Sequence, residues 1–593
     1  MKLLNTIGFK SPSLSYSVTL MLSMLAPSYA AYAQAPPLLP PTRDELDPVA
    51  RNAQAQTETR ISVDGDIERA PCPLADPAYA DVKITLNEVH FNNLKGLSEA
   101  ELRPTYAAYL GLEQPIGVLC DIRDAAAMAL RTKGYLAAVQ VPAQRIEGGV
   151  VNFEMLYARM TALRVRGATG GATKLIEHYL GQLTKDEIFD RNRAERYLLL
   201  ARDLPGYDVR LTLRPAGTGL GELVGEVTVI RTPVEVDFTV QNLAARDTGP
   251  WGGQVRAAFN GLTGQGDRTT VSFYSTSDFR EQQILQLGHE MRVGHEGLTL
   301  SGQFTYAWTK PDINAAANTP DLTARTLLAT GEISYPLIRT TGKTVRLTGG
   351  IDFLNQHVNF ITRLSEDRLR IGFARVDFEA IDARRLVIPR WRLAGALELR
   401  QGFALFGASQ GCAAGCGFGV TPPSRADGNP KSTVLRFAGE GEVLLSKSLS
   451  VNIQTRLQYG FTPLFSFEEF SGGNYTIGRG YDPATVIGDS GAAARFELRG
   501  PRLGITSSRK LVVQPYGFGD AAWAWDRNVP TNSTNRNPQR LISVGGGIRA
   551  DLSNRFRLDL SVAVPTERAG LQIKRGGPRV LLSLTTRLLP WRK

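Results

Sequence analysis

The feature that most constrains this chain is a strict alternation of apolar and polar side chains through its C-terminal part. Val451, Ile453 and Leu457 fall on one face of an extended segment. Asn452 and Arg456 fall on the other face, so that face carries charge as well as polar groups. A period of two residues is typical of a β-strand whose two faces meet different surroundings.

The alternation fits two classes of β-protein. A soluble sandwich turns its apolar face inward and its charged face to bulk water. A transmembrane barrel turns its apolar face to lipid and its charged face to a water-filled lumen. Candidate strands of about ten residues, the length of a tilted membrane crossing, favour the barrel. The lack of a segment that could pair two sheets favours it as well.

The helical period disappears beyond residue 233, and short alternating segments run from there to the C-terminus. We therefore predict α+β repeats followed by a transmembrane antiparallel β-barrel of about 16 strands over residues 233–593, an even number as bacterial barrels require. The predicted strands begin near Val234, Gly252, Asp267, Gln282, Gly297, Arg325, Lys343, Leu369, Arg390, Ser432, Ser450, Gly491, Leu511, Leu541, Phe556 and Arg579.

The composition and the N-terminus indicate a folded, exported protein. The chain has 593 residues, 68 Lys and Arg against 57 Asp and Glu, and 42% hydrophobic residues, which excludes a disordered chain. It has no Lys/Arg run of the kind that follows a phosphate backbone, so nucleic acid is not an expected partner. Lys2 and Lys10 precede a short apolar stretch and then small residues. Residues 1–33 are therefore predicted to be a secretory signal peptide, because the stretch is too short for a membrane-spanning helix.

Three regions lie between the signal peptide and the barrel. Residues 34–80 hold a Pro-rich strip and a capping-box pair, Thr42 and Glu45, which predicts the start of a polar helix. That helix is either a frayed tail or sits inside an aqueous cavity. Residues 81–158 and 159–232 each show a strand, two helices and two strands, which is an internal repeat. Small sheets with an exposed edge dock peptides by strand addition.

The lumen of such a barrel needs an occupant, because about sixteen strands enclose more space than wall side chains fill. The connection over residues 465–490 is the candidate, and its glycines allow a tight bend that carries Arg479 to a loop tip. An arginine inside a lumen needs an anionic partner, and Asp520 on the thirteenth strand offers one. The two motifs are Ile477-Gly478-Arg479-Gly480-Tyr481 and Gly517-Phe518-Gly519-Asp520.

This order of features resembles the two-partner secretion transporters, the outer-membrane exporters of haemolysins and haemagglutinins. The resemblance covers essentially the whole chain: signal peptide, polar N-terminal helix, two POTRA repeats, and a barrel with an Arg-Gly-Tyr loop. Further matching stretches are Lys133-Gly134-Tyr135-Leu136, Val141-Pro142-Ala143-Gln144, Asp203-Leu204-Pro205-Gly206, residues 264–267 and Gly488-Asp489-Ser490-Gly491.

The resemblance implies a fold, a location and a set of roles. The loop folds into the barrel and Arg479 pairs with Asp520 as a lock, while residues 43–60 match the helix that plugs the pore. The POTRA units, 81–158 and 159–232, lie in the periplasm and capture an unfolded secreted partner protein that becomes β-helical once exported. No enzymatic activity, cofactor or metal is implied.

The end of the chain departs from the family pattern. The family's last strand usually ends the chain on an aromatic residue that is recognised by the barrel assembly machinery, which inserts the strand into outer-membrane lipid. Here the predicted strand 579–588 is followed by the tail 589–593, Leu-Pro-Trp-Arg-Lys.

The four cysteines fall into two pairs. Cys72 with Cys120 is interpreted as a disulfide across the first repeat, consistent with an oxidising compartment. Cys412 and Cys416 lie in a Gly/Ala-rich loop between the ninth and tenth strands. For this pair a local disulfide is favoured over metal or redox chemistry.

Other functions fit less of the sequence. Residues 488–491 also resemble the nucleophile segment of chymotrypsin-like proteases, but no histidine lies in a matching context. Residues 342–344 resemble a phosphate loop, but Leu337 stands where its first glycine belongs. An outer-membrane insertase of the same superfamily usually carries more repeats, and a passive porin needs neither repeats nor a plug helix.

Overall fold

The structure is a computed structural model, and part of the chain falls outside what it describes. The predicted signal peptide and most of the predicted plug helix lie outside the described residues, as do the last three residues of the tail. Among the described residues, every helix is too short or too polar to cross a bilayer. The described residues are 42–46, 62–63, 72–219, 221–312, 321–383, 385, 389–412, 415–505, 511–528, 537–553, 555–570, 572 and 574–590.

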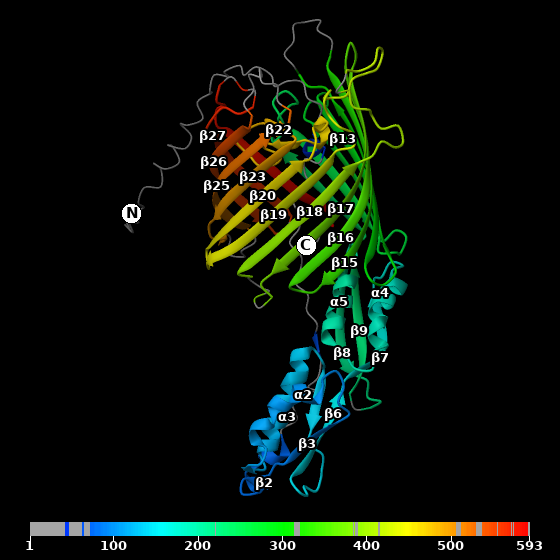
Figure 1. Cartoon of the computed structure of the whole chain (residues 1–593), viewed down its shortest axis with the longest axis vertical. Coiled ribbons are helices and arrows are strands. Elements are labelled where there is room, and N and C mark those ends of the chain that lie inside the picture. Colours follow the sequence, from blue (N-terminus) through cyan, green and yellow to red (C-terminus); the bar gives the residue numbers. More distant parts are fainter. Residues whose placement is uncertain are drawn as a thin grey trace, which may run out of the picture.

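The C-terminal part is a closed antiparallel barrel, which confirms the predicted fold class (Figure 1). The ring closes where β28 pairs with β10. β23 and the short β24 both pair with β25 and occupy one position, which makes sixteen positions. In order they are β10 (Val234–Gln241), β11 (Gly252–Asn260), β12 (Arg268–Thr276), β13 (Gln282–Val293), β14 (Leu298–Thr309), β15 (Thr323–Arg339), β16 (Lys343–Phe360), β17 (Thr362–Ile381), β18 (Trp391–Gly402), β19 (Thr433–Ser446), β20 (Leu449–Gly460), β23 (Ser490–Arg499) with β24 (Leu503–Gly504), β25 (Leu511–Trp525), β26 (Gln539–Leu552), β27 (Phe556–Pro565) and β28 (Arg579–Leu589).

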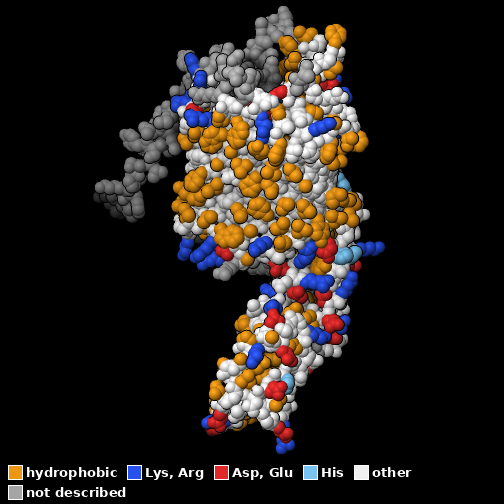
Figure 2. Space-filling view, in the orientation of Figure 1, with side chains coloured by type: hydrophobic (Ala, Val, Ile, Leu, Met, Phe, Trp, Pro, Cys, Tyr) orange, Lys and Arg blue, Asp and Glu red, His pale blue; other side chains and the backbone are white. Residues whose placement is uncertain are grey.

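The two faces of the barrel wall have opposite character. On β20, Ile453 and Leu457 are 46% and 48% exposed, whereas Asn452, the neighbour that precedes Ile453, is fully buried. Figure 2 shows the outward apolar side chains as a broad belt across the visible side of the wall, with charged side chains gathered along its lower border. Because an apolar belt of this size is stable only out of water, the wall is dissolved in lipid and its polar face meets the lumen.

The first N-terminal unit is a small α+β domain farthest from the barrel (Figure 1). Its sheet has the order β3–β6–β5, and α3 packs on it. The first predicted helix is irregular: α2 gives way to 3-10 turns at Arg103, because Pro104 has no amide hydrogen to continue the helical ladder. The elements are β2 (Lys83–Thr85), β3 (Glu88–Asn92), α2 (Glu99–Leu102), η4 (Arg103–Thr105), η5 (Ala107–Tyr109), β4 (Glu113–Pro115), α3 (Val118–Lys133), β5 (Ala137–Gln140) and β6 (Val150–Tyr157), preceded by η2 (Pro73–Ala75) and η3 (Pro77–Tyr79).

The second unit repeats this arrangement and lies directly below the barrel (Figure 1). Helices α4 and α5 bury Tyr179, Leu180 and Leu198 against the sheet. Asp190 caps α5 by accepting a hydrogen bond from the Asn192 amide at 2.8 Å. The sheet order is β1–β8–β9–β7, in which β1 (Ser62–Val63) pairs in parallel with β8. The elements are β7 (Arg159–Gly167), α4 (Thr173–Leu180), η6 (Gly181–Thr184), α5 (Arg191–Arg202), β8 (Tyr207–Pro215) and β9 (Glu222–Arg231).

Polar contacts fix the second unit to the adjacent barrel rim. The guanidinium of Arg339, at the end of β15, donates two hydrogen bonds of 2.7 Å to Asp203 after α5. The Tyr197 hydroxyl donates to Glu296 at 2.7 Å. The Arg231 guanidinium donates to the Asn260 carbonyl at 2.6 Å. Three contacts from three parts of the unit set its orientation beneath the pore.

Candidate functional site

The connection between β20 and β23 folds back into the lumen and packs on the wall. Within it, β21 (Phe470–Gly472) pairs with β22 (Val486–Gly488) as a short antiparallel hairpin, preceded by η7 (Ser466–Glu468). The wall strands leave room for this hairpin because their facing side chains are mostly alanines. The cluster consists of Phe470, Ile477, Tyr481 and Val486 from the loop with Ala493, Ala522, Ala524, Leu541 and Ala569.

Arg479 lies at the tip of this loop and contacts Asp520. Its Nε and Nη2 donate to the two carboxylate oxygens at 3.1 and 3.0 Å, and its backbone amide donates to Asp520 at 2.9 Å. Its Nη1 donates to Glu497 at 2.8 Å. The ring of Phe518 lies 3.4 Å from the guanidinium carbon, measured to the ring centroid. The side chain thus has charge partners, hydrogen bonds and a π-face, which a buried guanidinium needs.

Glu497 is a partner of Arg479 that the sequence reasoning missed. It lies on β23 and also accepts two hydrogen bonds of 3.0 Å from Arg549 and one of 3.0 Å from Arg499. Arg495, on the same face of β23, donates to Asp520 at 3.1 Å. The alternation of side chains along β23 predicts that Glu497 faces the lumen. Which residue it meets there depends on the register of the barrel, which places Glu497 beside the loop tip.

Two glycines of the loop motif approach the wall too closely for a side chain. Gly478 has φ +133°, and a Cβ there would lie 2.6 Å from Leu541. A Cβ on Gly480 would lie 2.7 Å from the Ser543 Cβ. The glycines at 517 and 519 differ, because a Cβ on either would meet no heavy atom closer than 3.9 Å. The close approach of the loop to the wall therefore does not depend on the glycines at 517 and 519.

The remaining members of the two motifs also have distinct surroundings. Ile477 is 2% exposed in the loop core. The Tyr481 hydroxyl lies 2.9 Å from the Ile542 carbonyl oxygen and 2.8 Å from that of Glu567. Loop 465–490 is thus fixed at its tip, at its hairpin and through its tyrosine.

Residues 42–46, the described start of the N-terminal segment 34–80, lie inside the barrel against this loop. Thr42 and Glu45 form the expected capping box around the 3-10 turn η1 (Arg43–Glu45). Asp44 accepts hydrogen bonds from Ser471 in the loop at 2.7 Å and from Arg456 on the wall at 3.1 Å. One short segment therefore connects the loop to the wall.

Arg400 is the centre of a second charge cluster, which the sequence reasoning did not find. It is 1% exposed and donates to Asp352 at 2.7 Å and to Glu468 of the loop at 2.8 Å. Arg43 of the N-terminal segment shares Asp352, at 3.0 Å. Leu46 packs beside these charges against Phe465 and neighbouring wall residues. The loop and the N-terminal segment therefore have common partners in the lumen.

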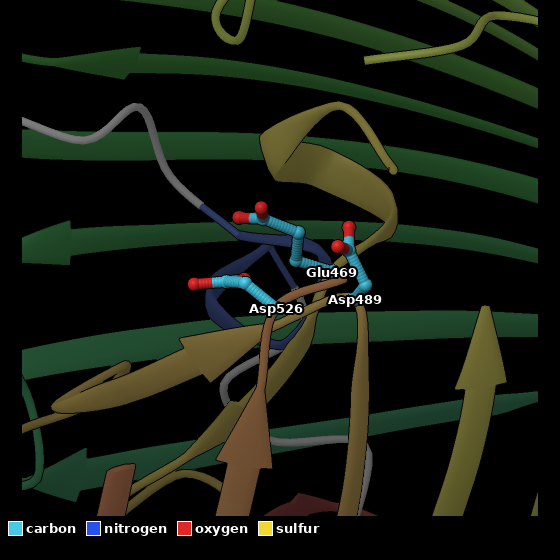
Figure 3. A group of neighbouring side chains, drawn as sticks. All are labelled: Glu469, Asp489 and Asp526. Carbon is cyan, nitrogen blue, oxygen red and sulfur yellow. The ribbon is translucent and has the colours of Figure 1, made fainter. Parts of the chain in front are cut away.

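Three carboxylates near the base of the loop have the spacing of a metal site (Figure 3). Oxygens of Glu469, Asp489 and Asp526 lie within 4.8 Å of one another. Nη1 of Arg425 lies 2.8, 2.8 and 3.5 Å from the three carboxylates. This guanidinium supplies the positive charge that the three acids need. Ser490, next in sequence, accepts a hydrogen bond from the Gly460 amide at 3.1 Å and so braces the strand end.

Both cysteine pairs are disulfides in the structure. Cys72 bonds to Cys120 in α3 and ties the end of the N-terminal linker to the first unit. Cys412 bonds to Cys416 in the loop between β18 and β19.

A cavity of about 1770 Å³ remains between the loop and the second unit. Arg479 and Glu497 line it beside the loop, and Asp203 and Tyr207 line it in the second unit. The cavity therefore extends from the second unit to the loop.

Models of known families match both parts of the chain. Residues 84–156 match the ShlB-type POTRA domain, and residues 227–550, more than half of the chain, match the haemolysin secretion/activation protein ShlB/FhaC/HecB. The chain belongs to this family. It is a two-partner secretion transporter of the outer membrane with its POTRA region in the periplasm, and this confirms the prediction over the insertase and porin alternatives. The family implies a secreted partner protein.

Two solved structures share the fold of the transporter. CdiB from Escherichia coli has a TM-score of 0.70 and 15% identity, covering 87% of this chain and 94% of that chain. CdiB from Acinetobacter baumannii has a TM-score of 0.60 and 16% identity, covering 97% of each. No curated protein sequence matches the chain.

Proposed function

We propose that the transporter captures its partner protein unfolded in the periplasm and passes it through the barrel after the lumenal loop and the N-terminal segment move aside. An unfolded chain has unpaired backbone groups that bind a sheet edge by strand addition. β3 and β5 are the two edges of the sheet in the first unit. In the second unit the β8 edge already pairs with β1, so a client strand binding there has to displace Ser62–Val63.

The charge of the lumen supports passage of a polar polypeptide. Peptide groups cost several kcal/mol each when they lose their hydrogen bonds in hydrocarbon, whereas a hydrated lumen keeps them satisfied. Arg495, Glu497 and Arg549 face this space.

The observation that carries the proposal is the buried contact of Arg479 with Asp520. It joins the tip of the loop to the thirteenth strand and stabilises the closed lumen. We take this contact as the lock of the transporter and residues 43–60 as its plug. Arrival of the partner at the cavity then shifts the balance from these internal contacts to contacts with the client.

Two further parts of the proposal concern the partner and the assembly. The client folds outside, as a β-helix, and this folding prevents its return. The barrel itself enters outer-membrane lipid through the barrel assembly machinery, with β28 as its last strand.

The partner is sought in the neighbouring open reading frame, and its appearance in the medium is the measured quantity. Removing residues 84–156 should abolish secretion while the barrel still assembles, as judged by its heat-modifiable mobility in gels. Undiminished secretion without this unit would contradict capture by the POTRA region. A client variant that cannot fold should stall in the pore, and its efficient release would exclude folding as the driving force.

A further inference from the structure

The outward face of the barrel carries a group of arginines at the end of the wall away from the POTRA units. β15 runs from the rim beside the second unit, at Arg339, to the opposite rim, at Thr323. At the rim away from the POTRA units, the start of β15, the end of β16 and the start of β17 therefore lie next to one another. The arginine patch consists of Arg325, Arg363, Arg368 and Arg370.

The strand register places these side chains on the lipid side of the wall. Arg370 pairs with Phe353, and Arg368 pairs with Asn355. Paired residues share a face of a sheet, and neighbours along a strand face opposite sides. Asp352 and Asp367 are each 1% exposed, so they face the lumen and the patch faces outward.

Exposed apolar side chains of the belt lie directly below the arginine patch. Ile351, two residues before Phe353 on the same face, is 52% exposed. Arg325 pairs with Trp308, whose ring meets Tyr306 edge-on at 4.5 Å between centroids. Tryptophan and tyrosine with this outward placement mark the level of the lipid headgroups. The patch therefore lies at the headgroup level of the outer leaflet.

The patch has more positive than negative charge. Among the described residues of the patch, four arginines face one carboxylate, Glu366, which accepts hydrogen bonds from Arg363 at 3.1 Å and from Arg368 at 3.0 Å. Like charges in one small area are unfavourable unless an anion compensates them.

Arg370 is positioned in advance of any ligand. Its Nη1 donates to the Leu354 and Leu369 carbonyls at 2.8 Å, its Nε to the Phe406 carbonyl at 3.3 Å and its Nη2 to Asn355 at 3.0 Å, which leaves one Nη2 hydrogen for a ligand. Its guanidinium carbon lies 5.4 Å from the centroid of the Phe353 ring. A guanidinium fixed over an aromatic ring loses little freedom when it binds an anion.

We propose that the arginine patch binds the phosphate groups of an anionic lipid of the outer leaflet. Guanidinium groups donate charge-assisted hydrogen bonds to phosphate oxygens. Arg370 offers one such donor, and Arg325, Arg363 and Arg368 supply the others. The acyl chains of the same lipid then cover Phe353, Ile351 and the belt beneath them. This apolar surface directly below the cations favours a lipid-borne phosphate over a free one. The inference rests on membrane insertion of the barrel and is independent of how the client is exported.

The test measures lipid retention by the purified full-length transporter. Native mass spectrometry follows binding of bisphosphorylated lipid A, the same lipid A without its phosphates, and inorganic phosphate as competitor. We expect the phosphorylated form alone to be retained. Replacing Arg325, Arg368 and Arg370 by glutamine should weaken retention about a hundredfold, at about 1 kcal/mol for each arginine.

The control removes the same charge from the periplasmic units. The triple variant Arg145→Gln, Arg164→Gln and Arg166→Gln should retain the phosphorylated lipid like the wild type. Equal retention of both lipid forms, or retention by the patch variant, would overturn the proposal. Competition by inorganic phosphate at equal concentration would show a free-phosphate site instead.

A second variant keeps the test decisive if the triple variant does not assemble. Glu366→Gln removes the one carboxylate that neutralises the patch and keeps the shape of the side chain. Retention of the phosphorylated lipid should rise, whereas an unchanged or lower retention contradicts the proposal.

Discussion

At the scale of the residue, buried arginines rather than apolar side chains determine where the lumenal loop sits. Arg479 and Arg400 are 7% and 1% exposed, and each contacts two carboxylates on different elements. A guanidinium has a fixed fork of donors, so its partners must lie in defined directions. Removing one member of such a group leaves an uncompensated buried charge, which costs about 3–5 kcal/mol.

Arg479→Ala tests the proposed lock. Asp520 keeps its contact with Arg495, and Glu497 keeps those with Arg499 and Arg549, so the wall stays paired. The loop, however, loses its attachment at the tip. We expect secretion of the partner to fall below about a tenth of the wild-type level, because a loop without its tip attachment no longer moves between two defined positions and obstructs the client. A loss of about 3 kcal/mol in loop attachment corresponds to more than a tenfold change in the population of the attached loop. The barrel should still assemble.

Arg540→Ala is the matched control, because Arg540 pairs with Glu567 but is 52% exposed. It should leave secretion unchanged. Normal secretion by Arg479→Ala would remove the loop tip from the mechanism.

Gly480→Ala tests the close approach of the loop to the wall. The new methyl group would lie 2.7 Å from Ser543 and 2.9 Å from the Pro565 nitrogen, so the loop has to shift. We expect faster proteolysis of loop 465–490 in the assembled barrel. Gly519→Ala, where a Cβ meets no atom within 4 Å, is the control and should digest like the wild type. Equal digestion of both variants would show that the loop tolerates the shift.

At the scale of the element, the N-terminal segment, the loop and the second unit are joined by a few polar contacts each. Asp44 bonds to both Ser471 and Arg456, so the segment and the loop move together or their shared contacts break. Directional hydrogen bonds hold the element in one position, and their small number keeps the free energy of its release low. An element that has to leave the lumen needs both.

Deleting residues 43–60 should raise the conductance of the barrel in planar bilayers. The deletion removes the contacts of Arg43 with Asp352 and of Asp44 with Arg456. The single change Asp44→Ala should raise the frequency of open events without changing the size of the fully open level. Unchanged conductance after the deletion would mean that the segment does not restrict the pore.

Asp203→Asn tests the joint between the second unit and the barrel. The change weakens both hydrogen bonds to Arg339, whose side chain is 7% exposed. We expect faster amide hydrogen exchange in α5 and at the end of β15. Asp208→Asn, which affects the more exposed pair with Arg210, should leave that exchange unchanged.

At the scale of the whole molecule, the barrel reverses the usual relation between polarity and burial. Most outward residues of its membrane belt are apolar and exposed, and many inward residues are polar or charged and buried. A folded barrel with this surface requires lipid or detergent.

Cysteine labelling tests this reversal. The four native cysteines are paired, so single introduced thiols are the labelled groups. Gln454→Cys, on the cavity wall, should react with a water-soluble maleimide in liposomes. Ile453→Cys, its neighbour on the outer face, should react only after the lipid is dissolved. Equal labelling at both positions would contradict the assigned faces.

Much of this architecture follows from local patterns. The sixteen predicted strand starts fall in or close to the observed strands, because one buried face and one lipid-facing face specify strand register residue by residue. The capping pair Thr42 and Glu45 was visible for the same reason, since its two members lie three residues apart.

The sequence by itself thus determined the class of fold, the order of the units and the two motifs of the loop and the thirteenth strand, because alternation, caps and motifs are properties of neighbouring residues. Only the tertiary structure decided that Glu497 joins Asp520 at Arg479, and that Arg400 joins the loop to the N-terminal segment. These partners lie on different strands, and closure of the barrel sets which inward side chains meet across the lumen. The pattern of neighbouring residues along the chain does not predict which side chains meet across the lumen.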